Sequence, residues 1–175
     1  EPALSLTTNS IYEGRVVLLG LEYLVMPNGE SIDLEVVRNP GGAAVVALDT
    51  DNLVCMLRQY RHAAGGWLWE LPAGKLEPGE AAQLTAQREL EEEAGLHAAS
   101  WHRIGEFLTT PGFCDEVIHL FIARDLTSTV AQPQSHELIE VHWLPLTTAL
   151  EQVQDGRIRD AKTMLGLLLA AGRAA

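Results

Sequence analysis

The stretch Gly74–Leu96, GKLEPGEAAQLTAQRELEEEAGL, decides how this chain is interpreted. A loop rich in proline and glycine leads into residues that favour a helix, and Gly95 is a typical helix stop. We therefore expect a helix from about Glu80 to Ala94. Apolar residues recur on it four positions apart and can pack into a core, namely Ala82, Ala86 and Leu90.

The acidic residues of this helix form a stripe of their own. At 3.6 residues per turn, Glu89 shares a face with Glu92 and Glu93. Like charges at this spacing destabilise a helix, and an ion pair of Arg88 with Glu92, four residues on, offsets part of that repulsion. A hard divalent cation offsets more of it, because carboxylate oxygens suit magnesium or manganese. A solvated acidic surface is the alternative interpretation, and the segment in front of the helix argues against it.

The whole stretch resembles the Nudix box at every fixed position. Gly74 is followed after five residues by Glu80, and after seven more by Arg88-Glu89 and an apolar residue. One residue later come the paired glutamates, and the box closes on Gly95 and an apolar residue. The chain is therefore similar to the Nudix hydrolases, and most similar to their ADP-ribose pyrophosphatase branch.

The order of predicted elements indicates a mixed α/β (α+β) fold in a single main domain. Residues 11–26 and 33–38, separated by Pro27-Asn28-Gly29, favour an N-terminal β-meander, and 43–49 with 53–60 favour a hairpin. Further strands are predicted at 103–108, 116–123 and 138–144, and helices at 147–154 and 160–171. The resemblance implies an α/β/α sandwich with a mixed sheet plus an N-terminal antiparallel sheet. We expect residues 1–40 to form the meander, in a homodimer interface, and 41–175 to form the hydrolase domain.

The bulk composition limits the partners. Twelve basic and 24 acidic residues give a net charge of −12, which argues against nucleic acid or an anionic membrane as a partner. No apolar run reaches membrane-spanning length, and no signal-peptide pattern opens the sequence. Cys55 and Cys114 lie in apolar surroundings and are expected to be free thiols, which favours the cytoplasm.

The resemblance also implies a metal site. Two or three Mg²⁺ ions, with Mn²⁺ as a substitute, would be held by the carbonyl of Ala73 and by Glu89, Glu92 and Glu93. Glu92, Glu93 and Arg88 are assigned to the catalytic residues, and Arg88 would mainly orient the loop and helix together with Glu80. None of the six histidines has zinc-site spacing.

The resemblance to the ADP-ribose pyrophosphatase branch rests on segments outside the box. Pro111 lies fifteen residues beyond Leu96, and its surroundings, TTPGFCDEVIHLFIA, resemble the corresponding segment of ADP-ribose pyrophosphatases. The matching stretches EVVRNPGGAAVVAL and MLRQYRHAAGGWLWELPAG imply substrate contacts from Arg38, Arg61 and Glu70. An ordinary turn at Pro111 and a surface salt bridge at Arg61 are the alternatives.

A general base is expected on a loop far from the box in sequence. Glu137 precedes a predicted strand and is favoured, whereas Glu140 lies within that strand and is the alternative. His136 beside them is interpreted as a bystander. Trp67 and Trp69 either line the wall that holds the base of the nucleotide or, as we favour, belong to the core.

The predicted reaction is Mg²⁺-dependent hydrolysis of ADP-ribose to AMP and ribose 5-phosphate. Another nucleoside diphosphate sugar, such as GDP-mannose, or a dinucleotide is the alternative substrate. A non-catalytic Nudix-like ligand sensor is a further alternative, which the intact set of box glutamates disfavours.

Overall fold

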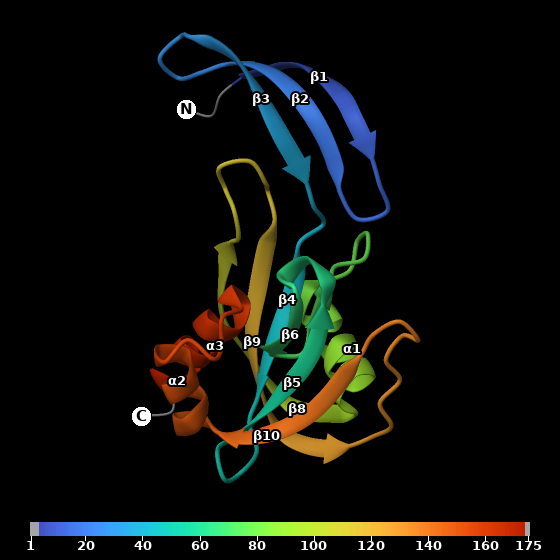
Figure 1. Cartoon of the computed structure of the whole chain (residues 1–175), viewed down its shortest axis with the longest axis vertical. Helices are drawn as coiled ribbons and strands as arrows, with labels where there is room; N and C mark the ends of the chain where they lie inside the picture. The colour runs from blue at the N-terminus through green and yellow to red at the C-terminus, as the bar shows by residue number, and fades with distance from the viewer. Residues whose placement is uncertain (1–3, 174–175) are drawn as a thin grey trace. The chain divides into compact units, whose positions relative to one another are not determined.

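The computed structural model describes residues 4–173, and the contacts of the chain divide it into two units (Figure 1). The N-terminal unit contains the described residues up to Gly41 together with Phe107–Val117. The larger unit contains Gly42–Glu106 and the described residues from Ile118 onward.

The N-terminal unit is built on an antiparallel meander. Strands β1 (Leu4–Glu13), β2 (Leu18–Val25) and β3 (Ser31–Arg38) lie side by side in that order. The expected run 11–26 is interrupted, because the backbone turns between β1 and β2 and Gly14 N donates to Val17 O at 3.0 Å.

A segment distant in sequence joins the meander. The N–H of Val37 donates to Phe113 O at 2.7 Å, and the N–H of Asp115 donates to Val37 O at 3.2 Å. The Asp115 carboxylate also accepts from Asn39 N at 2.9 Å. The N-terminal unit therefore includes residues 107–117 in addition to the segment 1–40 that we expected from the sequence. This addition depends on tertiary contacts, which local sequence patterns do not encode.

The larger unit contains two sheets. One is antiparallel, in the order β10 (Ile139–Pro145), β5 (Leu53–Arg61), β6 (Gly66–Glu70). The other has the order β7 (Ala73–Lys75), β4 (Gly42–Ala47), β9 (Val117–Ser128), β8 (Leu96–Leu108). It is a mixed sheet, because β4 runs antiparallel to β7 and parallel to β9. A short 3₁₀ turn, η1 (His62–Ala64), separates β5 from β6.

Helices cover both faces of the mixed sheet. Helix α1 (Ala82–Ala94) packs its buried Ala86 and Leu90 in one cluster with Ala43, Val45 and Phe121. Helix α3 (Ala161–Ala171) packs on the opposite face, where a Cβ at Gly166 would lie 2.7 Å from Leu71 and 3.2 Å from Val46. Helix α2 (Leu146–Gln154) lies beside α3 (Figure 1). The predicted α/β/α sandwich is confirmed.

The predicted hairpin of 43–49 with 53–60 is wrong. Apart from an isolated bridge between Leu48 and Val54, β4 and β5 pair with other strands and belong to different sheets. All six residues of β4 are buried, as are Val54–Leu57 in β5. Each strand needs cover on both of its faces, so each occupies the interior of its own sheet rather than half of a hairpin.

Candidate active site

Core packing sets the rotation of α1 and hence the direction of its glutamates. Because Ala86 and Leu90 face the mixed sheet with no exposed surface, the neighbouring stripe of the helix is turned towards β7. Glu89 and Glu93 are buried on that stripe, at 9% and 4% exposure, while Glu92 is half-buried. The helix ends at Gly95 in the left-handed conformation, as predicted.

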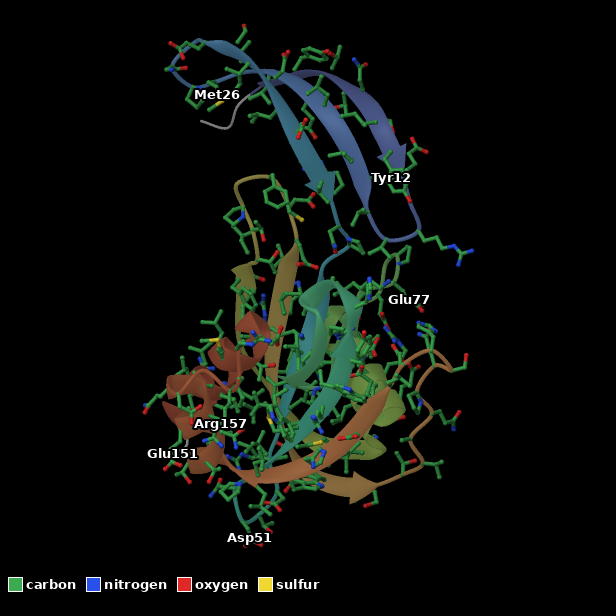
Figure 2. The ribbon with its side chains drawn as sticks, viewed as in Figure 1. Tyr12, Met26, Asp51, Glu77, Glu151 and Arg157 are labelled. Carbon is green, nitrogen blue, oxygen red and sulfur yellow. The ribbon has the colours of Figure 1, made fainter. Side chains whose placement is uncertain are left out.

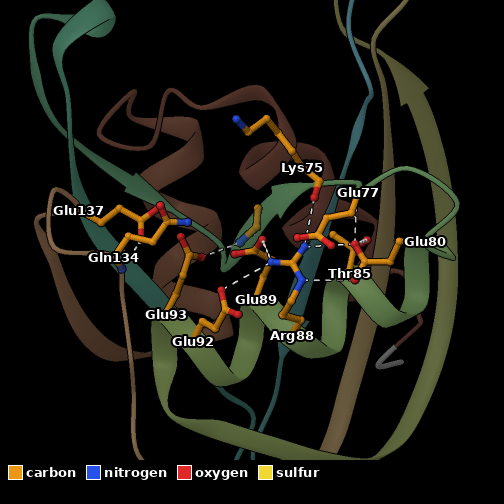
Figure 3. Close-up of polar contacts among 11 residues, drawn as sticks. Lys75, Glu77, Glu80, Thr85, Arg88, Glu89, Glu92, Glu93, Gln134 and Glu137 are labelled. Atoms are coloured by element: carbon orange, nitrogen blue, oxygen red, sulfur yellow. Dashed lines mark hydrogen bonds and ion pairs between the residues drawn. The ribbon is translucent and has the colours of Figure 1, made fainter. Parts of the chain in front are cut away.

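Arg88 ties the helix to the loop in front of it (Figure 3). Its guanidinium donates to both oxygens of Glu80 at 3.2 Å and to Lys75 O at 3.2 Å. Glu80 also accepts from Thr85 Oγ1 at 2.8 Å and from Glu77 N at 3.1 Å. Glu80 therefore belongs to the loop rather than to the helix, which begins two residues after the expected start.

The Arg88 guanidinium also forms ion pairs with two glutamates of the acidic stripe. Arg88 Nη1 lies 2.5 Å from Glu89 Oε1 and 3.5 Å from Glu92 Oε2, which is the ion pair expected across four residues. Burial raises the pKa of Glu89, Arg88 opposes the shift, and the charges of Glu92 and Glu137 add to it.

Glu93 links α1 to the strand that carries the predicted carbonyl ligand. Its Oε2 accepts a hydrogen bond from Ala73 N at 2.9 Å. In a strand the N–H and C=O of one residue point to the same side, so the Ala73 carbonyl also faces the helix rather than β4. Burial, reinforced by the charges of Glu89 and Glu137, raises the pKa of Glu93 to about 8.

This donor set fits a hard divalent cation. Two buried carboxylates, a half-buried third and a backbone carbonyl are all oxygen donors, the type of ligand that such a cation prefers. Within residues 4–173, no three acidic, histidine or cysteine side chains are already grouped around one point as metal ligands. Glu89 accepts a hydrogen bond from Arg88, and Glu93 accepts one from Ala73 N.

Of the two candidate bases, Glu137 is the one beside the buried glutamates. Its loop folds so that the Glu137 carboxylate accepts from Gln134 N at 2.8 Å, and its charge raises the pKa of both Glu89 and Glu93 (Figure 3). Glu140 lies on β10 and is half-exposed, 3.5 Å from Arg58.

Arg61 and the buried Glu70 form a partly buried ion pair at the same site. Glu70, at 1% exposure, accepts from Arg61 Nε at 2.8 Å and from Arg61 Nη2 at 2.9 Å, while the charge of Arg61 lowers the pKa of Glu93. Lys162 Nζ lies 2.6 Å from the second Glu70 oxygen. Burial raises the pKa of Glu70, but Arg61 and Lys162 together bring it below its ordinary value. Our sequence analysis missed Lys162, because it lies on α3, outside every motif.

Arg38 and Pro111 belong to the N-terminal unit. Arg38 is ion-paired with the buried Glu22 and, at 3.1 Å, with Asp115. It lines a hollow of about 300 Å³ on the meander together with Glu22, Val36 and residues of β1 and β2. Pro111 is exposed, in the turn that ends at Cys114.

Trp67 and Trp69 lie on β6. We favoured a core position for both, and this prediction is wrong for Trp67. Trp67 is 41% exposed and contacts Tyr60 edge-on, with the Arg58 guanidinium 5.4 Å from its ring centre. Trp69 is half-buried against His142. An alternating strand exposes one face, and apolar composition alone does not reveal which face is covered.

Comparison with known proteins decides the family. The model of the NUDIX domain matches residues 38–166, which include the whole loop–helix segment and Arg61, Glu70 and Glu137. The chain belongs to the Nudix family. The predicted enzyme class, a Nudix pyrophosphohydrolase, is likewise confirmed.

Several known proteins match this chain over most of their length. The chain is 39% identical to the methanol dehydrogenase activator of Bacillus methanolicus, covering 93% of this chain and 89% of that protein. It is 37% identical to the ADP-ribose pyrophosphatase of Bacillus subtilis (strain 168), covering 91% and 87%. It is 35% identical to the GDP-mannose pyrophosphatase of Cronobacter sakazakii, covering 87% and 86%.

A solved structure supports the Nudix fold independently. The crystal structure of an ADP compounds hydrolase aligns with a TM-score of 0.85, covering 99% of this chain and 94% of the other at 20% identity. At that identity the likeness bears on the fold alone. No helix between residues 4 and 173 is long and apolar enough to cross a membrane.

Proposed function

We propose that this Nudix enzyme hydrolyses ADP-ribose to AMP and ribose 5-phosphate. The observation that carries the proposal is the pair of buried carboxylates of Glu89 and Glu93 on one face of α1, with Glu137 close enough for its charge to raise the pKa of both and Arg61 close enough to lower that of Glu93. A site that gathers negative charge in this way is suited to a metal-bound diphosphate. The 37% identity to an ADP-ribose pyrophosphatase supports the choice of substrate.

We propose Mg²⁺ as the cofactor, two or three ions per site, with Mn²⁺ as a substitute. The ligands would be the carbonyl of Ala73 and the carboxylates of Glu89, Glu92 and Glu93. When bound, the metal supplies charge neutralisation at the diphosphate oxygens and lowers the pKa of a coordinated water.

The residues of the chain have separate tasks in the proposed reaction. Glu137 accepts a proton from the attacking water, whose oxygen forms a new bond to phosphorus while the bridging P–O bond breaks. The leaving phosphate carries away the bridging oxygen and its electron pair. Arg61 binds the diphosphate, and its planar guanidinium suits paired phosphate oxygens. Arg88 holds the helix to the loop and stays clear of the substrate.

The N-terminal unit is proposed to contribute to substrate binding. Arg38 would contact the nucleotide, and Pro111 would shape the edge of the substrate site. The hollow on the meander, lined by Arg38 and Glu22, supports the first assignment.

A second substrate class has an observation in its favour. The chain is also 35% identical to a GDP-mannose pyrophosphatase, so another nucleoside diphosphate sugar is the competing substrate. The distinguishing test is a panel of ADP-ribose, GDP-mannose and a dinucleoside diphosphate with Mg²⁺, scored for each nucleotide product. We expect the highest kcat/KM with ADP-ribose and AMP as its product. A higher kcat/KM with GDP-mannose would overturn the substrate, and no hydrolysis of any compound would favour a ligand sensor.

We also propose a homodimer, located in the cytoplasm. The meander exposes large apolar side chains, among them Ile11, Leu18, Leu34 and Tyr12, the last of which is labelled in Figure 2. A second subunit would cover them. Both cysteines are free thiols, as a reducing compartment requires. Light scattering with size-exclusion chromatography tests the assembly, and a mass near 19.1 kDa would contradict it.

A further inference from the structure

Lys162 contacts the segment immediately in front of the box although it lies on the last helix. Its ammonium is 2.6 Å from Glu70 Oε2 and 3.0 Å from Asp160 Oδ2. The side chain is only 16% exposed, so these carboxylates replace most of its hydration. A lysine that gives up water in this way is held in one place rather than moving freely at the surface.

Glu70 transmits this contact to Arg61. Its two oxygens bind Nε and Nη2 of the guanidinium, and Lys162 bonds the oxygen that already accepts from Nη2. A buried carboxylate is stable only when charge and hydrogen bonds compensate it on all sides. Lys162 therefore fixes the orientation of the Glu70 carboxylate. Because Arg61 donates to both oxygens of that carboxylate, the orientation of the guanidinium is fixed as well.

The first turn of α3 provides a rigid base for Lys162. Asp160 caps the helix by accepting from Thr163 N at 3.0 Å and from Thr163 Oγ1 at 2.5 Å. The same Thr163 hydroxyl accepts from Leu71 N at 2.9 Å. One helical turn thus holds both the Glu70 side chain and the backbone that leads to Ala73.

We propose that Lys162 is a positioning residue, which acts through Glu70 to hold the Arg61 guanidinium in the orientation that binds the diphosphate of the substrate. The proposal rests on the proposed function, because it assigns Arg61 to the diphosphate. Lys162 itself does not contact the substrate. Arg61 keeps both N–H groups of Nη1 and the second N–H of Nη2 for phosphate, since Glu70 accepts from Nε–H and from one N–H of Nη2.

The test is a double-mutant cycle on steady-state kinetics. Lys162→Met is expected to raise KM for ADP-ribose about tenfold while kcat changes less than about twofold, as for the loss of one oriented binding contact. Lys162→Arg, which retains a cation, is expected to recover part of the loss. In an Arg61→Met background the same Lys162→Met change is expected to alter KM less than about twofold, because residues acting as a unit are not additive.

A matched control comes from the connection between α2 and α3. Arg157 is 59% exposed and pairs only with Asp155 among the ion pairs of the described chain (Figure 2). Arg157→Met removes a nearby cation without touching the Glu70 network, so KM is expected to stay at the wild-type value. Thermal unfolding checks that each variant is folded, and Lys162→Gln replaces Lys162→Met in the cycle if the latter does not fold.

The outcomes separate the two proposals. An active wild type whose KM is unchanged by Lys162→Met overturns the positioning role alone. An equal rise in KM in both Arg61 backgrounds also overturns it, because Lys162 would then act independently of Arg61. A wild type that hydrolyses GDP-mannose but not ADP-ribose overturns the substrate, and the cycle is then measured with GDP-mannose. Hydrolysis of neither compound overturns both proposals.

Discussion

The carboxylate of Glu89 occupies the space that a side chain at position 74 would need. A Cβ built on Gly74 would lie 1.9 Å from Glu89 Oε1 and 2.1 Å from its carboxyl carbon. The φ angle of Gly74 is not in the left-handed region, so space rather than backbone strain requires a glycine there. The first residue of the box and its first helical glutamate are therefore coupled by contact.

This contact predicts the effect of Gly74→Ala. The methyl group would displace the Glu89 carboxylate, which is the flexible end of a side chain, so the fold is expected to persist while the metal site is distorted. We expect kcat/KM to fall about tenfold or more, with a higher Mg²⁺ concentration needed for half-maximal rate. Gly172→Ala is the control, because a Cβ there meets nothing closer than 3.8 Å. Unchanged Mg²⁺ dependence in Gly74→Ala would contradict the assignment of Glu89.

Metal binding is predicted to stabilise the folded protein. A cation that binds the native carboxylates but not the unfolded chain raises the free energy of unfolding, so Mg²⁺ is expected to increase Tm by several degrees. Glu93→Gln is expected to abolish the increase while keeping the acceptor for Ala73 N. Glu91→Gln, on the same helix but half-exposed beside His97, is expected to leave it intact. Equal shifts in both variants would place the metal elsewhere.

The two candidate bases are predicted to differ sharply in their effect on turnover. Glu137→Gln is expected to lower kcat by about 10²–10⁴, the usual contribution of a positioned general base. The Mg²⁺-induced increase in Tm should remain in that variant. Glu140→Gln removes a half-exposed partner of Arg58 and His142 and is expected to stay near the wild-type rate. The reverse order of the two rates would assign the base to Glu140.

Glu80 is predicted to make the free energy of unfolding depend on pH in the acidic range. The Arg88 guanidinium, helped by Thr85, lowers the pKa of Glu80 from 4.5 to about 2, against the opposing effect of burial. The native state therefore stabilises the charged form of Glu80 relative to the unfolded chain. Its contribution is present above pH 4.5 and is lost as pH falls towards about 2. Wild type should exceed Glu80→Gln in free energy of unfolding at neutral pH.

The acid dependence is measured by urea unfolding at several pH values. The difference between wild type and Glu80→Gln should shrink progressively below about pH 4.5. Glu77→Gln is the matched control, because the exposed Glu77 contributes to this network through its backbone N–H. A difference that is independent of pH would mean that the charge of Glu80 plays no part.

Local patterns were sufficient for the helix of the box and its neighbours. Helical spacing correctly predicted that Ala86 and Leu90 pack into the core, the stop at Gly95 and the pair of Arg88 with Glu92, because each of these patterns is set by residues a few positions apart. It did not predict the burial of Thr85, Glu89 and Glu93. The same reasoning failed for β4 and β5. Their turn is local, but β4 pairs with β7 and β9, and β5 pairs with the adjacent β6 and the distant β10. The apolar pattern of a strand does not indicate which sheet the strand joins.

The sequence by itself determined the family and the acidic stripe of α1, since both lie in one continuous segment with fixed spacing. Only the tertiary structure decided which groups join that stripe. Glu137 comes from a loop, Arg61 and Glu70 from a second sheet, and Lys162 from the last helix. Their meeting depends on how α1 and α3 pack against opposite faces of the mixed sheet. Ion pairs between such distant segments form only after that packing has placed the backbone, so no spacing rule could predict them.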